Sequence, residues 1–162
     1  MVAAVNGVGV GLGFTILGYC EFVFIAESAR LRTPFSQLGL SPEASSSYLF
    51  PLRMGWQNAS RALLMGEWFD AQRTVDAGLA MQVTPDGKVQ EVALEFASRL
   101  AASPLQSLVA TKGLMLRAHA NQVTEARRLE TASLARLVRT PANVEAIAAF
   151  QKRREGARPG SA

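Results

Sequence analysis

Glu43 is the one charged residue in the segment TPFSQLGLSPEASSSYLFP, residues 33–51. A carboxylate among apolar side chains can take up and return a proton, which is the task of a general acid–base catalyst. The presence of an acidic residue at position 43 also has a structural explanation, as part of a helix start. Ser41 is a favoured helix N-cap, Pro42 is favoured at the first helical position, and an acidic residue in the first turn is stabilised by the helix dipole. Taken alone, these residues favour the structural explanation.

A glycine-rich stretch, NGVGVGLG (residues 6–13), is a second place where chemistry could occur. It does not match the dinucleotide-binding pattern G-x-G-x-x-G, because Leu12, Phe14 or Ile16 stands where the third glycine belongs. It is not a phosphate-binding Walker A loop either, since no Gly-Lys-Ser/Thr follows. Unpaired backbone N–H groups at a strand-to-helix turn can stabilise an oxyanion. The spacing by itself favours the alternative, a tight packing turn.

Cysteine and histidine each occur once, as Cys20 and His119. One cysteine excludes an intrachain disulfide, and metal sites built from several Cys or His ligands are excluded as well. A His-based catalytic triad would have to use His119. We therefore expect no metal centre, and we expect Cys20 to have a packing role.

The composition is typical of a soluble globular domain, with 162 residues of which 49% are hydrophobic and 19% charged. The net charge of +4 arises mainly near the end of the chain, where basic residues lie among helix-forming ones. This pattern indicates a solvated helical face and no nucleic-acid partner. Residues 1–26 carry a single charge, Glu21, but their glycines and the missing basic n-region argue against a membrane span or signal peptide. We expect no membrane partner and a cytoplasmic location.

The elements that must position Glu43 and the glycine stretch follow from the hydrophobic pattern. We expect strands at 1–5, 21–26, 29–33 and 81–84, a short buried helix at 14–18, a helix that begins at Ser41, and helices over 58–64, 71–77, 88–102, 104–118, 121–139 and 141–154. The fold class is therefore α/β in the first part and helical in the second. We divide the chain into a core at 1–87, a helical region at 88–155 and a flexible tail at 156–162.

Several motifs together resemble the enoyl-CoA hydratase/isomerase (crotonase) superfamily. They are AVNGVGVGLG at 4–13, CEFVFIAESARLRTPFSQLGLSPE at 20–43, GEWFDAQRTVDAGLAMQV at 66–83 and AIAAFQKRREGARP at 146–159. The resemblance covers nearly the whole chain and implies part of a ββα spiral core followed by a helical trimerisation region. Superfamily members have an extra N-terminal segment, so we expect this chain to be a C-terminal part or a shortened form.

The resemblance also implies a site. One half of the superfamily's oxyanion hole is a backbone N–H that corresponds to Leu12 here, and the other half lies in the N-terminal segment. The two acids of the hydratases correspond to Thr15 and Phe35, neither of which can transfer a proton as hydration requires. The residues expected to bind substrate are Gly11, Thr15, Pro34, Phe35 and Leu38.

The segment LGLSPEASSSYLFP (residues 38–51) is similar to the Δ3,Δ2-enoyl-CoA isomerases of the peroxisomal type and to their chromodomain-bearing relatives. In those isomerases the glutamate of this motif is the catalytic base, which implies that role for Glu43. The resemblance further implies an acyl-CoA thioester substrate, no cofactor beyond the CoA of that substrate, and a homotrimer or hexamer. The alternatives are a non-catalytic acyl-CoA-binding or oligomerisation module, an inactive fragment and, less favoured, a hydratase.

Overall fold

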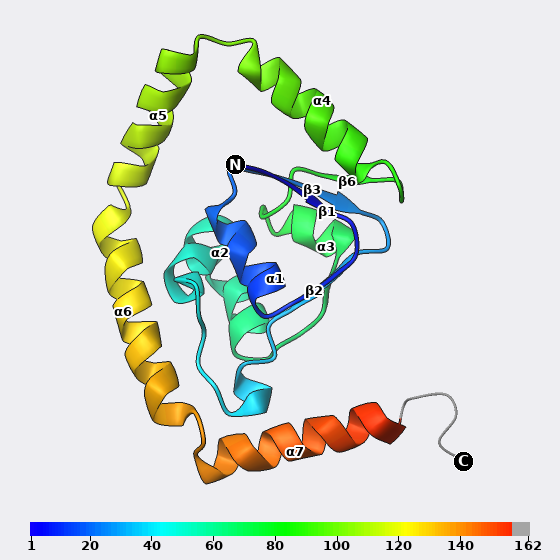
Figure 1. Ribbon diagram of the computed structural model, residues 1–162, viewed down its shortest axis with the longest axis vertical. Helices are drawn as coiled ribbons and strands as arrows, with labels where there is room; N and C mark the ends of the chain where they lie inside the picture. The colour runs from blue at the N-terminus through cyan, green and yellow to red at the C-terminus, as the bar shows by residue number, and fades with distance from the viewer. Residues whose placement is uncertain (157–162) are drawn as a thin grey trace.

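The computed structural model describes residues 1–156, which form two small sheets and a set of helices (Figure 1). The first sheet has the order β1–β3–β6, all parallel, with strands Val2–Val5, Phe22–Ala26 and Gln82–Thr84. The second has the order β2–β4–β5, with strands Val8–Val10, Arg30–Arg32 and Phe69–Asp70, and only its β4–β5 pair is antiparallel. The chain thus passes through both sheets twice in the same direction, first as β1 and β2 and then as β3 and β4.

Aromatic side chains fill the core on both sides of these strands. Phe14 contacts Phe50 and Phe69, with ring centroids 4.9 and 5.6 Å apart, and all three are fully buried. Phe96 packs against Phe22 and Phe24 on the other side, at 4.7 and 5.2 Å. Burying each of the fully buried rings stabilises the fold by about 1.5–3 kcal/mol. This burial explains why FVFIA in β3 reads as a continuous apolar run.

Short helical elements connect the strands. They are α1 (Leu12–Thr15), the 3₁₀ helices η1 (Ile16–Tyr19) and η2 (Ser36–Leu38), α2 (Ser46–Leu63) and α3 (Ala71–Asp76). The α2 helix is kinked at Gly55, where φ is 73°. The α3 helix begins at a capping side chain, since Asp70 accepts a hydrogen bond from the N–H of Arg73 at 2.8 Å.

Four longer helices follow the sheets: α4 (Val89–Ala101), α5 (Leu105–Arg117), α6 (Ala120–Leu137) and α7 (Pro141–Gly156). Figure 1 shows them as an arc that runs along the top, the left and the bottom of the core. In this arc α4 packs on β1 and β3, α6 on α2, and α7 on η2, whereas α5 has no buried residue. None of the helices within residues 1–156 is long and apolar enough to cross a bilayer.

Most of the expected elements are confirmed, and three expectations are wrong. The glycine stretch contains the strand β2, and the helix after it begins at Leu12 and is not fully buried, since Leu12 and Ile16 are exposed. The helix expected at Ser41 begins at Ser46. The expected tail lies outside the described residues apart from Gly156.

Candidate active site

Gly11 forms the turn between β2 and α1. Its φ of 59° is in the left-handed region, which glycine adopts without steric cost. Its N–H donates to the carbonyl of Arg32 at 2.9 Å and so extends the β2–β4 pairing by one bond. Its own carbonyl accepts hydrogen bonds from the N–H groups of Phe14 and Thr15, at 2.9 and 3.0 Å. The turn is thus fixed from both sides.

The N–H of Leu12 lies at the start of α1, where a helix offers no intrahelical acceptor. Within residues 1–156 no backbone carbonyl accepts a hydrogen bond from it. The Leu12 side chain is 55% exposed, so solvent or a ligand can approach this turn. An N–H of this kind can bind an oxygen that develops negative charge.

Glu43 lies next to this turn although it is distant in the sequence. A Cβ atom placed on Gly11 would lie 3.7 Å from Oε1 of Glu43. The residue is half-buried. Among the side chains that the structure describes, none donates a hydrogen bond to its carboxylate or forms an ion pair with it. An unpaired carboxylate beside a free N–H is an arrangement that can move a proton on a molecule held between them.

The loop that carries Glu43 corrects the helix-start interpretation. Glu43 lies outside α2, and the first turn of that helix contains no acidic residue. Ala44 and Ser45 follow with φ values of 57° and 54°, a left-handed conformation that is incompatible with a continuing helix. The carbonyl of Glu43 accepts hydrogen bonds from the N–H and Oγ of Ser46, at 3.1 and 2.6 Å. The helix-dipole explanation for this carboxylate therefore does not apply.

The other residues expected at the site differ in access, and of them Thr15 contacts the Gly11 turn directly. Thr15 is fully buried beneath it, and its hydroxyl donates to the Gly11 carbonyl at 3.4 Å. Pro34 and Phe35 are buried in the segment between β4 and η2, and Leu38 is half-buried at the end of η2.

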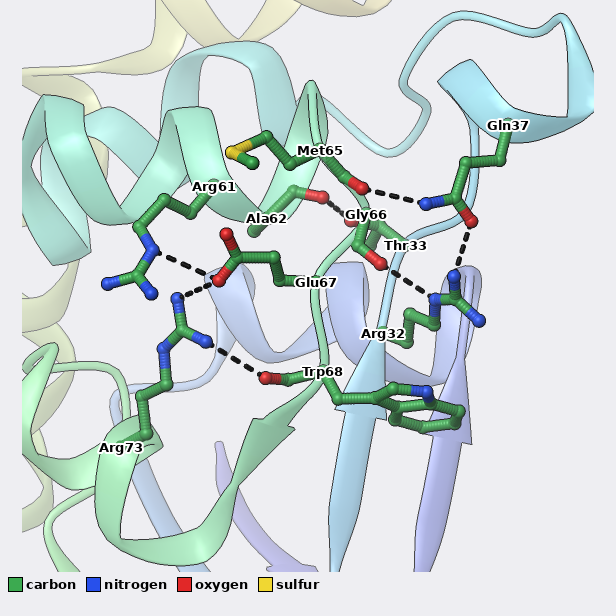
Figure 2. Close-up of polar contacts among 10 residues, drawn as sticks. All are labelled: Arg32, Thr33, Gln37, Arg61, Ala62, Met65, Gly66, Glu67, Trp68 and Arg73. Atoms are coloured by element: carbon green, nitrogen blue, oxygen red, sulfur yellow. Dashed lines mark hydrogen bonds and ion pairs between the residues drawn. The ribbon is translucent and has the colours of Figure 1, made fainter.

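A polar network fixes the segment that contains Pro34 and Phe35 (Figure 2). Thr33 Oγ1 donates to the carbonyl of Ala62 at 2.6 Å, and Arg32 Nε donates to the carbonyl of Gly66 at 2.7 Å. Gln37 adds a hydrogen bond from Nε2 to the carbonyl of Met65 at 2.8 Å. These bonds attach β4 and η2 to the last turn of α2 and to the loop that follows it.

Glu67 forms the second part of this network. Its Oε2 contacts Arg73 at 2.7 Å and Arg61 at 3.0 Å, which joins α2 to α3 (Figure 2). The hydrogen bond from Arg73 and the positive charges of both arginines lower the pKa of the Glu67 carboxyl below its usual range.

The comparison with protein families identifies the chain. The enoyl-CoA hydratase/isomerase profile matches residues 1–157. The chain belongs to the enoyl-CoA hydratase/isomerase family. An enoyl-CoA hydratase/isomerase of known structure from Pseudoalteromonas atlantica superposes with a TM-score of 0.90 at 33% identity, over 94% of this chain and 61% of that one. The predicted crotonase fold, mixed α/β with a helical C-terminal part, is confirmed.

The relatives of this chain include proteins named as isomerases and proteins named as hydratases. The enoyl-CoA delta isomerase 2 of Rattus norvegicus is 44% identical over 86 residues, which are 53% of this chain and 22% of that protein. A probable enoyl-CoA hydratase of Mycobacterium tuberculosis is 35% identical and covers 94% of this chain and 61% of that protein. The chain thus spans less than two thirds of the length of each of these relatives.

The sequence did not reveal two residues next to the site. Tyr19 OH donates to Ser45 Oγ at 2.9 Å, and Glu130 accepts the N–H of Ser45 at 2.6 Å. Glu130 lies 85 residues from its partner, on a helix with many charged residues, so no local pattern distinguishes it. Its burial is visible only in the folded chain.

Proposed function

We propose that this chain carries the catalytic base of an enoyl-CoA isomerase that moves a double bond from C3=C4 to C2=C3 of an acyl-CoA thioester. The observation that carries the proposal is the 3.7 Å approach of Glu43 Oε1 to the Cβ position of Gly11, beside the free N–H of Leu12. The two groups come from the start of α1 and from the loop before α2, which lie next to each other at the Gly11 turn. The partial similarity to a delta isomerase supports the same activity.

The mechanism needs one carboxylate and no net water. Glu43 removes a proton from C2, the electron pair of that C–H bond passes into a dienolate, and the thioester oxygen becomes negatively charged. The N–H of Leu12 donates to this oxygen and stabilises it. The protonated Glu43 then returns the proton to C4, which completes the new C2=C3 bond. The reaction changes no oxidation state, so we propose no cofactor other than the CoA of the substrate.

Hydration is the less favoured activity. It requires one group to activate water and another to protonate carbon. Thr15 and Phe35, which stand at the two positions that the resemblance assigns to these acids, have no carboxyl group, and both are buried.

In the proposed isomerase, the acyl chain of the substrate would be bordered by Gly11, Leu38, Pro34 and Phe35.

The alternative is a module that binds acyl-CoA or assembles without catalysis. Exposed apolar residues on α5 favour assembly: Leu105, Val109, Leu114 and Met115 have 72%, 63%, 65% and 60% of their surface accessible. We propose a homotrimer or hexamer that uses this helical half. A cytoplasmic location, with no nucleic-acid or membrane partner, completes the proposal.

Glu43→Gln tests the activity, because the amide keeps the size of the side chain and cannot act as the base. We expect the conversion of a 3-enoyl-CoA to its conjugated isomer, followed chromatographically, to slow by about 10²–10⁴-fold. Binding of the acyl-CoA should change little, which calorimetry can measure.

Glu27→Gln is the matched control, since Glu27 is an exposed glutamate after β3 and away from the site. Its rate should equal that of the unchanged chain. Unchanged isomerisation by Glu43→Gln would disprove the assignment. Acyl-CoA binding without any turnover in the unchanged chain would instead support the binding module.

A further inference from the structure

The α6 helix buries a carboxylate against the start of α2. Glu130 is 5% exposed, whereas Glu125, the other acidic residue of α6, is exposed. Oε2 of Glu130 accepts the N–H of Ser45 at 2.6 Å, and Oε1 accepts the N–H of Ser47 at 2.8 Å. The first N–H groups of a helix have no intrahelical acceptor, and hydrogen bonds to a charged acceptor are strong. Glu130 thus caps α2 from a distant helix.

Two further contacts come from the same face of α6. The carbonyl of Val123 accepts the hydroxyl of Ser45 at 3.0 Å. Arg127 donates to Tyr19 OH at 3.3 Å, and that hydroxyl donates to Ser45 Oγ at 2.9 Å. Residues three and four apart on a helix lie on one face, so Val123, Arg127 and Glu130 act on the turn together. We call these three residues the α6 clamp.

The clamp holds a backbone conformation that the turn would not prefer alone. Ala44 and Ser45 have φ values of 57° and 54°, and a left-handed conformation persists in such residues only when the surroundings impose it. Glu43 directly precedes this turn, and its carbonyl bonds to Ser46. The direction of the Glu43 side chain toward Gly11 therefore depends on the turn and, through it, on α6.

We propose that Glu130 is a positioning residue for Glu43: its two backbone hydrogen bonds hold the Ala44–Ser45 turn that directs the Glu43 carboxylate at the oxyanion-binding turn. This proposal rests on the proposed function, in which Glu43 is the base. Glu130 itself touches no reacting atom. Its contribution lies in keeping the base where a small displacement would slow proton transfer.

Glu130→Gln tests the proposal, because an amide can accept from only one of the two N–H groups and turns its own NH₂ toward the other. We expect kcat for the 3-enoyl-CoA to fall about 10- to 100-fold while KM changes less than about threefold. We also expect the carboxyl-carbon NMR resonance of Glu43, assigned with Glu43→Gln, to shift in the variant. A resonance shift together with the fall in kcat supports the proposal.

Glu125→Gln is the matched control on the same helix, since within the described part of the chain Glu125 pairs only with Arg128 at the surface. It should leave both readouts unchanged. An unchanged Glu43 resonance in folded Glu130→Gln would overturn the proposal, whatever the rate. Absence of isomerase turnover in the unchanged chain would sink the proposed function, while the resonance would still decide whether Glu130 positions Glu43.

Amide hydrogen exchange of the unchanged chain decides the matter if Glu130→Gln does not fold. The N–H groups of Ser45 and Ser47 should exchange far more slowly than the N–H of Ala44, because only the former two are bound to the buried carboxylate. Equally fast exchange at all three would overturn the proposal.

Discussion

At the scale of single residues, the site depends on backbone conformations with positive φ at Gly11, Ala44 and Ser45. Glycine adopts such a conformation freely, whereas the other two residues require support from the hydrogen bonds around Ser45. The carboxylate and the free N–H are therefore brought together by two turns of different origin. One is permitted by the residue type, and the other is imposed by tertiary contacts.

Gly11→Ala should damage both the turn and the site. A side chain at φ 59° costs about 1–2 kcal/mol of folding stability, which urea unfolding can measure. The new methyl group would also lie 3.7 Å from Glu43 Oε1, in the space that a reacting molecule needs, so isomerase activity should fall.

Gly7→Ala is the control for that substitution. A Cβ at Gly7 meets nothing within 4 Å, and its φ is not positive. Its stability should stay within about 0.5 kcal/mol of the unchanged chain, with activity retained. Equal behaviour of the two variants would contradict the role given to the Gly11 turn.

At the scale of elements, the segment that contains Pro34 and Phe35 is held by the network between β4, the α2–β5 loop and α3 (Figure 2). Gly66 belongs to this network. A Cβ atom at Gly66 would lie 3.2 Å from the Thr33 carbonyl oxygen, so glycine lets the two backbone segments approach closely. Glu67 then joins α2 to α3 through Arg61 and Arg73. Pro34 and Phe35 are consequently placed by contacts outside their own segment.

Acid should weaken this junction through Glu67. Because the pKa of Glu67 is lower in the folded chain than in the unfolded chain, the unfolded chain binds the proton more readily. The stability that Glu67 contributes is thus present above the unfolded pKa of about 4.3 and is lost as the pH falls through the folded pKa. Glu67→Gln should flatten the fall in melting temperature between about pH 5 and 3.

Glu91→Gln provides the comparison, since Glu91 is paired with Lys88 only in an exposed i,i+3 contact. It should leave the acid dependence nearly as in the unchanged chain, because exposed pairs are screened by water and salt. An acid profile of Glu67→Gln identical to that of the unchanged chain would show that the ionisation of Glu67 contributes nothing to stability.

At the scale of the whole molecule, the helices after β6 form an arc whose contacts with the core are uneven (Figure 1). Helices α4, α6 and α7 each pack on a core element, whereas α5 has no buried residue and presents several leucine, valine and methionine side chains. Exposed apolar surface of this extent favours association.

The assembly that we propose predicts that Leu105→Glu combined with Val109→Glu will lower the molecular mass in solution. Charged side chains on α5 cannot be buried in an apolar interface without a large cost. Light scattering coupled to size exclusion should give a trimer or hexamer for the unchanged chain and a smaller species for the double variant.

Gln106→Glu adds a charge to an exposed polar position of the same helix and should leave the mass unchanged. A monomeric unchanged chain would refute the assembly. Equal dissociation by Gln106→Glu would mean that charge alone, and not the apolar face, controls association.

The amino-acid sequence by itself determined the elements whose signals are local. The buried run of β3 and the long helices after Gly87 follow from hydrophobic spacing and from breakers such as Pro104 and Pro141. The motif order was sufficient to predict the crotonase fold and to single out Glu43. These properties depend on residues close together in the chain, so they can be read without coordinates.

Tertiary structure alone decided where Glu43 points and what holds it there. Ser41-Pro42-Glu43 has the composition of a helix start, yet α2 begins at Ser46, because Glu130 from α6 caps that helix through Ser45 and Ser47. The strand β2 was missed for a similar reason, since its glycine-rich residues gain their order from pairing with β4. Local propensity at these positions is weak, and contacts between distant segments contribute more free energy than it does.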